Sequence, residues 1–432
     1  MRVFFRLVPA FLLLGLFMGP GIAARAGDRQ TQGEEQLEAL VNRAATGNPE
    51  ILVSEEQWRM SVARARQAGV LDDPMLMLGV QNALIRDPFN FSRDAMTSKV
   101  VGISQKVPFF GKRDLMREEA GLESEVERWA VEERRLELRR LVKETWYQIY
   151  LIDRSLETVR TSATLLDDLV RQAESMYTVG KAGQQEVFQA QLERSKMEEL
   201  RLGLEQRRAS SAAALNALVS RPPDTALSPI APIKLRSRPL VAAELERLAE
   251  SQRPALKALQ AKIDKGRAGE RLARKEFYPD FTVSLEYMQR EPVDDMRGDD
   301  MYAAQLSFNL PVQQEWRRAK AAEMQASIRM AIQERAALHN QIGKTIADGL
   351  AQLERSRKLA QLYEQGMLAQ AGGAAEAAMA GYRTGKATFA EVLAGRVNLF
   401  NAEREYHGAV AEHQIQLAVL ENVIGGPLPP PR

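Results

Sequence analysis

The residues of this chain that could do chemistry occur in pairs, and the two members of each pair are separated by the same number of residues. Glu186 and Glu391 lie 205 residues apart, and so do Tyr177 and Tyr382. The chemistry that they offer is electrostatic, because a carboxylate that recurs at one place in a fold raises the local concentration of cations. A second interpretation stays open: each glutamate is an ordinary surface residue early in a helix, where the helix dipole favours an acid. The tyrosines could be packing residues.

We find no sequence motif for enzymatic catalysis. The chain carries no nucleophile elbow, phosphate-binding loop or paired acids in an enzymatic context. His339, His407 and His413 are not spaced as neighbours on a helix face, so we predict no metal site. The chain has no cysteine, which excludes disulfides, thiolate metal sites and a lipid-bearing N-terminal cysteine. We therefore expect a protein that is not an enzyme and holds no cofactor.

The paired residues belong to a duplication of nearly the whole chain. Prolines and glycines that punctuate structure recur at the same offset of 205 residues, and one proline pair slips to 203. The pairs are Pro49 and Pro254, Pro74 and Pro279, Gly180 and Gly385, and, with the slip, Pro108 and Pro311. Each copy predicts the same order of a helix, two short strands and a very long helix. That order is not a usual layer plan of a globular domain.

The N-terminus predicts export from the cytoplasm. Arg2 and Arg6 form a positive start, Phe11 to Met18 is an apolar run broken by one glycine, and Ala24-Arg25-Ala26 is a small-x-small cleavage site. These features are typical of a removable secretory signal, too short for a membrane-spanning helix. We expect residues 1–26 to be removed.

The charge balance gives no case for a nucleic-acid partner. The precursor has 59 basic and 57 acidic residues, and the predicted signal removes three arginines, which leaves 56 against 57. A near-neutral chain lacks the basic surface that nucleic-acid binding requires.

One segment in each copy predicts a β-hairpin, at about 74–108 in the first and about 280–310 in the second. Apolar residues alternate with polar ones in the second hairpin, with Phe281 and Val283 on one face and Thr282 and Ser284 on the other. Each strand has about ten residues, the length of a tilted strand that spans a bilayer. Met75 and Met77 could contact copper or silver. We interpret them instead as bulk that faces lipid or core, as is usual for methionine on an apolar strand.

A helix of unusual length follows each hairpin. From Lys112 to about Met176 the sequence has no proline, and large apolar residues recur every seven positions. This repeat predicts packing along a neighbouring helix for many turns, over roughly 100 Å at 1.5 Å per residue. The counterpart runs from about Glu315 to Met379. Glycine turns at about 178–183 and 383–387 end the two helices.

These patterns predict the organisation of the chain. After the signal at 1–26, we expect a first repeat at 27–220, a Pro-rich linker or equatorial segment at 221–240, a second repeat at 241–424 and a flexible tail at 425–432.

Two hairpins from one chain cannot close a barrel. Unpaired backbone groups in a bilayer cost several kcal/mol each, so membrane-spanning sheets are closed. Several chains must contribute, and a trimer would supply about 12 strands. We predict a mostly α-helical fold with a small β part. Its long, coiled-coil-like helices form a periplasmic α-barrel that continues a 12-stranded transmembrane β-barrel with four strands per chain.

The chain resembles the TolC family of outer-membrane efflux channels. The resemblance rests on the duplication, on the strand segment FYPDFTVSLEY and on the tip sequences YTVGK (Tyr177–Lys181) and YRTGK (Tyr382–Lys386). Two segments resemble the CzcC/CusC-like branch of this family, which serves heavy-metal cation exporters: Gly102–Arg113 and Leu71–Val80. The resemblance implies a homotrimer in the outer membrane of a Gram-negative bacterium, in contact with lipid. Its periplasmic tip would dock a periplasmic adaptor (membrane fusion) protein coupled to an inner-membrane pump of the RND type.

The resemblance also implies roles for the tip residues. The positions that match the adaptor-gripping turn are Val179, Gly180, Lys181, Thr384, Gly385 and Lys386, with Thr384 replacing the usual valine. The positions that match the gate are Tyr177, Glu186, Tyr382 and Glu391. Gln189 and Ala394 stand where the family often has a second acid, so the acidic ring is thinner in this chain.

A competing interpretation is a periplasmic coiled-coil adaptor or scaffold that does not span the membrane. Such an adaptor would carry a lipoyl-like or barrel domain between its helical arms. The duplicated hairpins of membrane-spanning length favour the channel.

Overall fold

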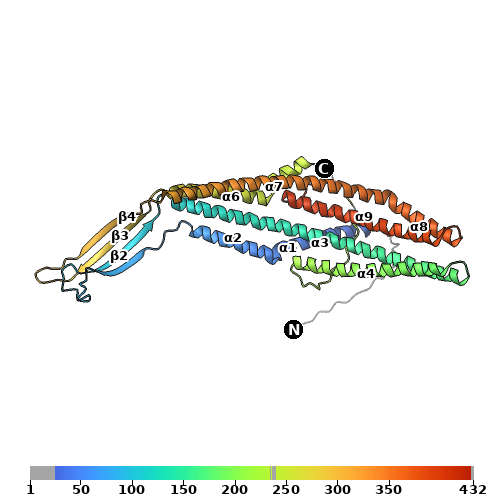
Figure 1. Cartoon of the computed structure of the whole chain (residues 1–432), viewed down its shortest axis with the longest axis horizontal. Helices are drawn as coiled ribbons and strands as arrows, with labels where there is room; N and C mark the ends of the chain where they lie inside the picture. The colour runs from blue at the N-terminus through green and yellow to red at the C-terminus, as the bar shows by residue number, and fades with distance from the viewer. Residues whose placement is uncertain (1–24, 234, 236–239, 430–432) are drawn as a thin grey trace, which may run out of the picture.

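The computed structural model describes residues 25–429 except 234 and 236–239, and side chains from residue 36 onward. The predicted signal at 1–26 lies outside the described residues apart from its last two. The chain forms a long rod, with a small sheet at one end and two hairpin turns between helices at the other (Figure 1). The mostly helical fold with a small sheet is as the sequence predicts.

The two copies have parallel sets of elements. The first contains α1 (Arg25–Gly47), α2 (Pro49–Gln67), β1 (Met75–Gln81), β2 (Ser98–Val107), α3 (Lys112–Thr178) and α4 (Gln184–Leu218). The second contains α5 (Ala242–Gln252), α6 (Pro254–Lys275), β3 (Phe281–Arg290), β4 (Met301–Phe308), α7 (Gln314–Leu362), a π-helical turn (Tyr363–Met367), α8 (Leu368–Arg383) and α9 (Phe389–Ile424).

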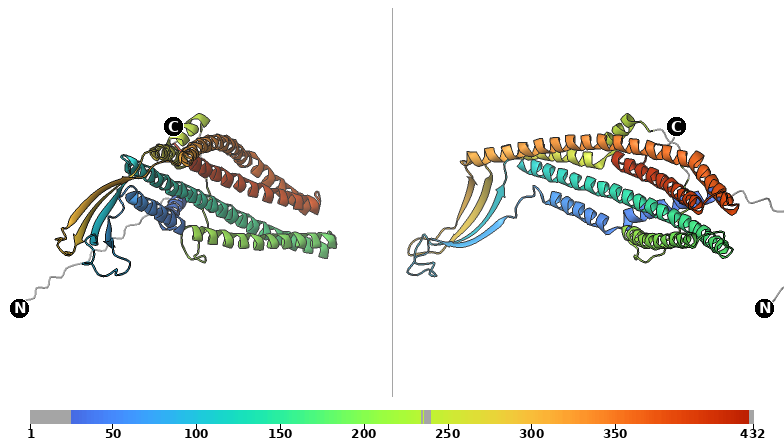
Figure 2. Two further views of the ribbon diagram at one scale, coloured as in Figure 1. Left: turned by 60° about the vertical axis from the view of Figure 1, so that its left-hand side comes forward. Right: turned by 45° about the vertical axis from the view of Figure 1, so that its right-hand side comes forward.

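The long helix α3 sets the length of the rod. It has 67 residues, which corresponds to about 100 Å. Gly111 precedes it in the left-handed conformation, with φ of 80°. The shorter helices pack beside α3: α4 covers its tip half, and α2 and α6 cover its half nearer the sheet (Figures 1 and 2).

The second long helix differs from the continuous helix that the sequence predicts, because the π-helical turn separates α7 from α8. The offset between the copies explains the turn. Arg113 and Arg317 lie 204 residues apart, whereas Tyr177 and Tyr382 lie 205 apart, so the second helix holds one additional residue. A π-turn takes up one residue more than an α-turn.

The four strands form one antiparallel sheet in the order β1-β2-β3-β4. The register pairs Leu78 with Val101, Val101 with Tyr287 and Tyr287 with Tyr302. In this sheet β1 and β4 each have a strand neighbour on one side. Two edges with unpaired backbone groups are therefore available to strands from other chains.

The register divides the sheet into two chemically different faces. One face carries large apolar side chains from all four strands, including Leu76, Leu78, Val101, Ile103, Leu285, Tyr287, Tyr302 and Phe308. The other carries mainly small, polar and methionine side chains, including Ser104, Gly102, Ser284, Glu286, Gln305 and Ser307. Met75 and Met77 lie on this second face. The interpretation of these two methionines as lipid- or core-facing bulk stays a prediction.

The helical part is held by separate clusters of buried side chains rather than by one core. A cluster at the middle of the rod joins α1, α3, α4 and α9 around Trp146 and Tyr150. Another joins α5, α7 and α9, and it includes Leu428, which is 7% exposed. The described part of the tail expected to be flexible is therefore packed, because Leu428 supplies an apolar side chain to this cluster.

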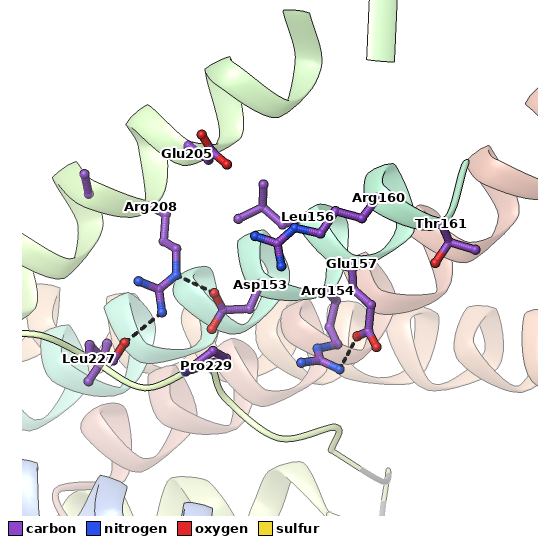
Figure 3. A pocket seen from close by; sticks show the side chains of 11 residues that line it. Asp153, Arg154, Leu156, Glu157, Arg160, Thr161, Glu205, Arg208, Leu227 and Pro229 are labelled. Carbon is purple, nitrogen blue, oxygen red and sulfur yellow. Dashed lines mark hydrogen bonds and ion pairs between the residues drawn. The ribbon is translucent and has the colours of Figure 1, made fainter. Parts of the chain in front are cut away.

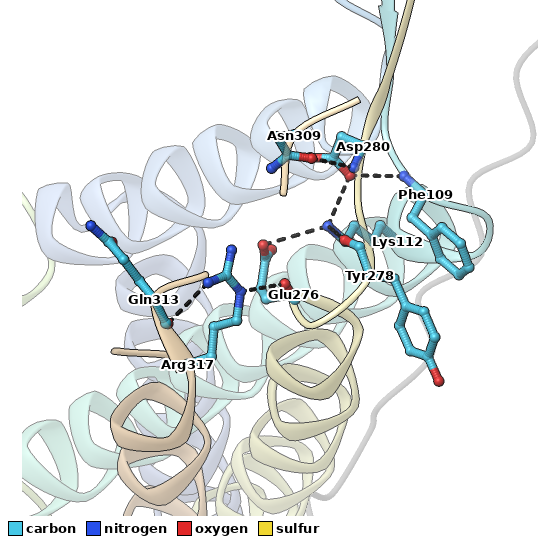
Figure 4. A network of polar contacts seen from close by, with 8 residues as sticks. All are labelled: Phe109, Lys112, Glu276, Tyr278, Asp280, Asn309, Gln313 and Arg317. Atoms are coloured by element: carbon cyan, nitrogen blue, oxygen red, sulfur yellow. Dashed lines mark hydrogen bonds and ion pairs between the residues drawn. The ribbon is translucent and has the colours of Figure 1, made fainter. Parts of the chain in front are cut away.

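A network of polar contacts joins the sheet to the helices (Figure 4). Lys112, the first residue of α3, is 2% exposed, and its Nζ donates to Asp280 Oδ1 at 2.8 Å and to the Tyr278 carbonyl at 3.2 Å. Asp280 also accepts from the Phe109 backbone N–H at 2.9 Å. Burial acts to raise the pKa of Asp280, but these hydrogen bonds outweigh it and hold the pKa below its usual value.

An arginine recurs at this junction in both copies. Arg113 Nε donates to the Gly69 carbonyl at 2.7 Å, and Arg317 Nε donates to the Glu276 carbonyl at 2.6 Å. Both carbonyls follow the last turn of a short helix, where backbone acceptors lack helical partners. The duplicated arginine therefore fixes each short helix to the start of each long one.

Candidate functional site

The two tip turns at the end of the rod are built in the same way. In the first, Gly180 N–H donates to the Tyr177 carbonyl at 3.0 Å and Lys181 N–H donates to the Met176 carbonyl at 2.8 Å. In the second, the matching bonds are 3.1 Å from Gly385 to Tyr382 and 2.8 Å from Lys386 to Gly381. This pair of bonds defines a Schellman motif, which places a left-handed residue after the helix. Gly180 and Gly385 both have φ of 72°, which glycine adopts at low energy.

The helices that leave the two turns begin differently. In the second copy Thr388 and Glu391 form a capping box: Thr388 Oγ1 accepts from Glu391 N–H at 3.3 Å, and Thr388 N–H donates to Glu391 Oε2 at 2.7 Å. The bond from the Thr388 backbone N–H, and then one from the Thr388 hydroxyl to the same carboxylate oxygen, lower the pKa of Glu391. In the first copy Gly183 takes the cap position and supplies no side-chain hydrogen bond.

Without a capping side chain in its own hairpin, Glu186 reaches the other copy. Its Oε2 accepts a hydrogen bond of 2.6 Å from the hydroxyl of Tyr382. The Tyr382 ring is 6% exposed and packs edge to face on Phe389, with ring centroids 5.9 Å apart. Burial, and then the Glu186 carboxylate, raise the pKa of Tyr382, so the hydroxyl stays protonated and donates.

The other predicted tip residues are exposed. Tyr177 is 48% exposed, against 6% for its counterpart Tyr382. Val179 is exposed, and so are Gly180, Lys181, Thr384, Gly385 and Lys386. The structure thus brings together two of the four gate candidates, Glu186 and Tyr382. Tyr177 and Glu391 lie outside that contact. The six turn residues form two projecting loops that a partner can reach.

A buried cluster beneath the turns holds the two hairpins together. Its members come from α3, α4, α8 and α9: Leu166, Leu169, Ala173, Val187, Ala190, Tyr382, Phe389 and Val392. Sequence reasoning missed Phe389 and Thr388. The spacing of threonine and glutamate in TFAE (Thr388–Glu391) is a capping-box signature that would have found Thr388.

A cleft of about 580 Å³ lies at the middle of the rod, between α3, α4 and the Pro-rich segment (Figure 3). Asp153 anchors that segment: it accepts from Arg208 Nε at 2.6 Å and from the Ile230 backbone N–H at 2.9 Å. Arg208 also donates to the Leu227 carbonyl at 2.9 Å. Because these charges are paired with one another and with the backbone, their arrangement fastens the segment to the helices rather than forming a reaction centre.

Two features are absent from the described part of the chain. Its histidine, aspartate and glutamate side chains form no group of three that could hold a metal ion. In the same residues, no helix is both long enough and apolar enough to cross a membrane.

Comparisons with known proteins agree with this architecture. Residues 245–426 match the family described as outer membrane efflux protein. The cobalt-zinc-cadmium resistance protein CzcC of Cupriavidus metallidurans is 24% identical over 435 residues, which cover 96% of this chain and 99% of CzcC. The fold is similar to that of the outer membrane protein VceC of Vibrio cholerae, with a TM-score of 0.77, 19% identity and coverage of 92% and 98% of the two chains. It is also similar to that of CusC, with a TM-score of 0.77, 15% identity and coverage of 91% and 92%.

The fold and these matches are those of outer-membrane channel proteins. Residues 245–426 match the outer membrane efflux proteins, and the resemblance predicted from the sequence is confirmed.

Proposed function

We propose that three copies of this chain form a passive exit duct, with a barrel of about 12 strands in the outer membrane. The observation that carries the proposal is the sheet. Its apolar face suits lipid, its polar face suits an aqueous interior, and its edges at β1 and β4 lack partners among the described residues. Closure with neighbouring chains would satisfy both edges.

The duplication supports closure of the helical part as well. Leu393 on α9 packs against the tip cluster, and Val397 lines a cavity of about 170 Å³ between α3, α4 and α9. The equivalent residues on α4 are Phe188 and Leu192, and both are exposed. If a neighbouring chain repeated the contact that α9 makes with α3 inside one chain, its α8 would cover Phe188 and Leu192. The residue of α8 equivalent to Leu166 of α3 is Ala371, so the large side chains on α4 would pack against a small one.

The tips are the proposed docking site for a periplasmic adaptor coupled to an inner-membrane pump of the RND type. The two turns project the exposed residues Val179, Lys181, Thr384 and Lys386 from the end of the rod. Because both turns have the same backbone geometry, three chains would present six similar turns. An adaptor assembled from six copies could contact each of them.

The contact between Glu186 and Tyr382 is the proposed latch of the closed tip. It joins the α3–α4 hairpin to the α8–α9 hairpin at 2.6 Å. Movement of one hairpin away from the other must break this bond. Tyr177 and Glu391 would line the passage without taking part in the latch.

Heavy-metal cations are the proposed cargo. CzcC, which is similar to this chain over nearly its whole length, is described as a cobalt-zinc-cadmium resistance protein. Deletion of the gene from its native host should increase sensitivity to zinc, cobalt and cadmium. Sensitivity to hydrophobic drugs alone would contradict the metal cargo and leave the channel in place.

Cysteine cross-linking tests the trimer directly, because the chain has no cysteine of its own. A variant with Phe188→Cys and Ala371→Cys should form disulfides between chains and give trimer bands in the outer-membrane fraction. Phe188→Cys with Met60→Cys, an exposed residue on α2, is the matched control and should stay uncross-linked. A periplasmic monomer that gives no bands would contradict the duct and favour a periplasmic adaptor or scaffold.

A further inference from the structure

The methionines of the sheet all lie on one face. The strands contain Met75 and Met77 on β1, Met288 on β3 and Met301 on β4. The register places all four on the polar face, where Met288 is directly opposite Met301. The apolar face carries mainly leucine, valine, isoleucine and aromatic residues, with a few polar ones such as Lys99 and Gln105, and its strands have no methionine there. If methionine served only as apolar bulk, it would be expected on both faces.

The β1 end of the polar face gives its methionines little to pack against. Their cross-strand partners there are Ser104 and Gly102, and Met75 is 70% exposed. Met288 is half-buried opposite Val100, which is 6% exposed. Gly79, on the same face of β1, has no atom within 4 Å of where a Cβ would lie. An exposed methionine thioether gains little from burial there, whereas its sulfur stays free to bind a ligand.

Met77 and Glu286 converge over a glycine. They flank Gly102 in the register, and a Cβ built on Gly102 would lie 3.2 Å from Met77 Cε and 3.0 Å from Glu286 Cγ. The absence of a side chain at Gly102 therefore lets a thioether and a carboxylate approach each other across β2. A thioether donor beside a negative charge suits a soft cation, because the sulfur supplies the bond and the carboxylate compensates the charge.

We propose that Met75, Met77, Met288 and Met301, together with Glu286, form a band of weak binding sites for a soft monovalent cation, Cu⁺ or Ag⁺, on the inner wall of the barrel. The inference rests on the proposed duct, because the polar face lines a lumen only when the sheet closes. Thioether sulfur binds Cu⁺ and Ag⁺ in preference to harder cations. Several weak sites along a passage allow an ion to enter and to leave.

Silver titration of the full-length mature protein in detergent tests the band. Methionine labelled with carbon-13 at its methyl group gives one signal per residue, assigned by single Met→Leu substitutions. The four sheet signals should shift at Ag⁺ concentrations about tenfold lower than those of Met60 and Met330, which are exposed on α2 and α7. Equal concentrations for the sheet and helix methionines, or no shift of the sheet signals, would overturn the inference.

A second variant separates the thioethers from the carboxylate. Glu286→Gln should raise the Ag⁺ concentration needed to shift the Met77 signal and leave the Met60 signal unchanged. An unchanged Met77 titration would remove Glu286 from the site. Potassium conductance of the same preparations in planar bilayers, without silver, tests the duct by itself. Shifted signals without conductance would contradict the proposed function, and conductance without shifted signals would contradict the band.

Discussion

The two hairpin tips have nearly the same backbone and different side-chain contacts. Both end in Schellman turns around Gly180 and Gly385. In the second tip, Glu391 is bound to the start of its own helix by Thr388. In the first tip, Gly183 leaves Glu186 without such a partner, and Glu186 instead binds Tyr382 of the other copy. The two tips thus differ at the cap position. With threonine there, Glu391 stabilises its own helix, whereas with glycine there, Glu186 joins the two hairpins.

The comparison shows that duplicated positions need not keep equivalent roles. Tyr177 is exposed and Tyr382 is buried, although they are equivalent in sequence. Only one tyrosine and one glutamate of the two pairs meet within the chain. The following substitutions test this asymmetry.

The largest difference is expected between alanine substitutions of the two tyrosines. Tyr382→Ala removes a buried ring from the tip cluster and should destabilise the tip by about 3 kcal/mol or more. Tyr177→Ala should change its stability by less than about 0.5 kcal/mol. Hydrogen exchange of the tip segments of α3, α4, α8 and α9 measures both effects. Similar increases in exchange for the two variants would show that the tips are equivalent after all.

The latch is tested by a double-mutant cycle. Tyr382→Phe and Glu186→Gln each weaken a hydrogen bond to a charged group, worth about 1.5–3 kcal/mol. Each variant should raise the resting conductance of the channel in a planar bilayer, and the double variant should add little to either single one. Tyr177→Phe with Glu391→Gln is the control pair and should show additive, small effects. Additive effects of Tyr382→Phe and Glu186→Gln would rule out a direct latch.

Loss of the capping box should affect only the second hairpin. Thr388→Ala should destabilise the start of α9 by about 1 kcal/mol. Hydrogen exchange should increase in the first turn of α9 and stay unchanged in that of α4. If resting conductance rose as much as in Tyr382→Phe, the separation between cap and latch would be wrong.

The smallest and most specific effect is expected from Gly183→Ser. Gly183 has φ of −84°, and the nearest atom to an added Cβ is 4.0 Å away, so serine fits. The change creates a capping box with Glu186 at its third position and should stabilise the start of α4 by a few tenths of a kcal/mol. Because Glu186 would then be drawn toward its own helix, resting conductance should rise slightly. Gly183→Ala lacks the hydroxyl and should leave conductance as it is.

Sequence patterns predicted the long helices and the second pair of strands because those elements have clear periods. The face of β1 could not be predicted, since Met75 to Val80 is almost entirely apolar and shows no alternation. Pairing with β2 alone decides that Met75 and Met77 lie on the polar face.

The contact between Glu186 and Tyr382 was also beyond the sequence. The two residues are 196 positions apart and belong to different copies, so the internal symmetry suggested equal roles. The capping signature at Thr388 was present and would have distinguished Glu391 from Glu186. The sequence shows the additional residue of the second long helix only as a change in the number of residues between equivalent positions of the two copies. It does not show where in the helix that residue lies.

The π-helical turn at Tyr363–Met367 has a consequence for how such a chain can change length during evolution. An inserted residue in an α-helix rotates everything beyond it by about 100° and advances it by about 1.5 Å. Without a π-turn, that rotation would move the tip of the second copy out of phase with the first. Confined to five residues, the insertion leaves Tyr382 and Gly385 where the symmetry needs them. The copies can therefore diverge in length while their two tips keep a common geometry.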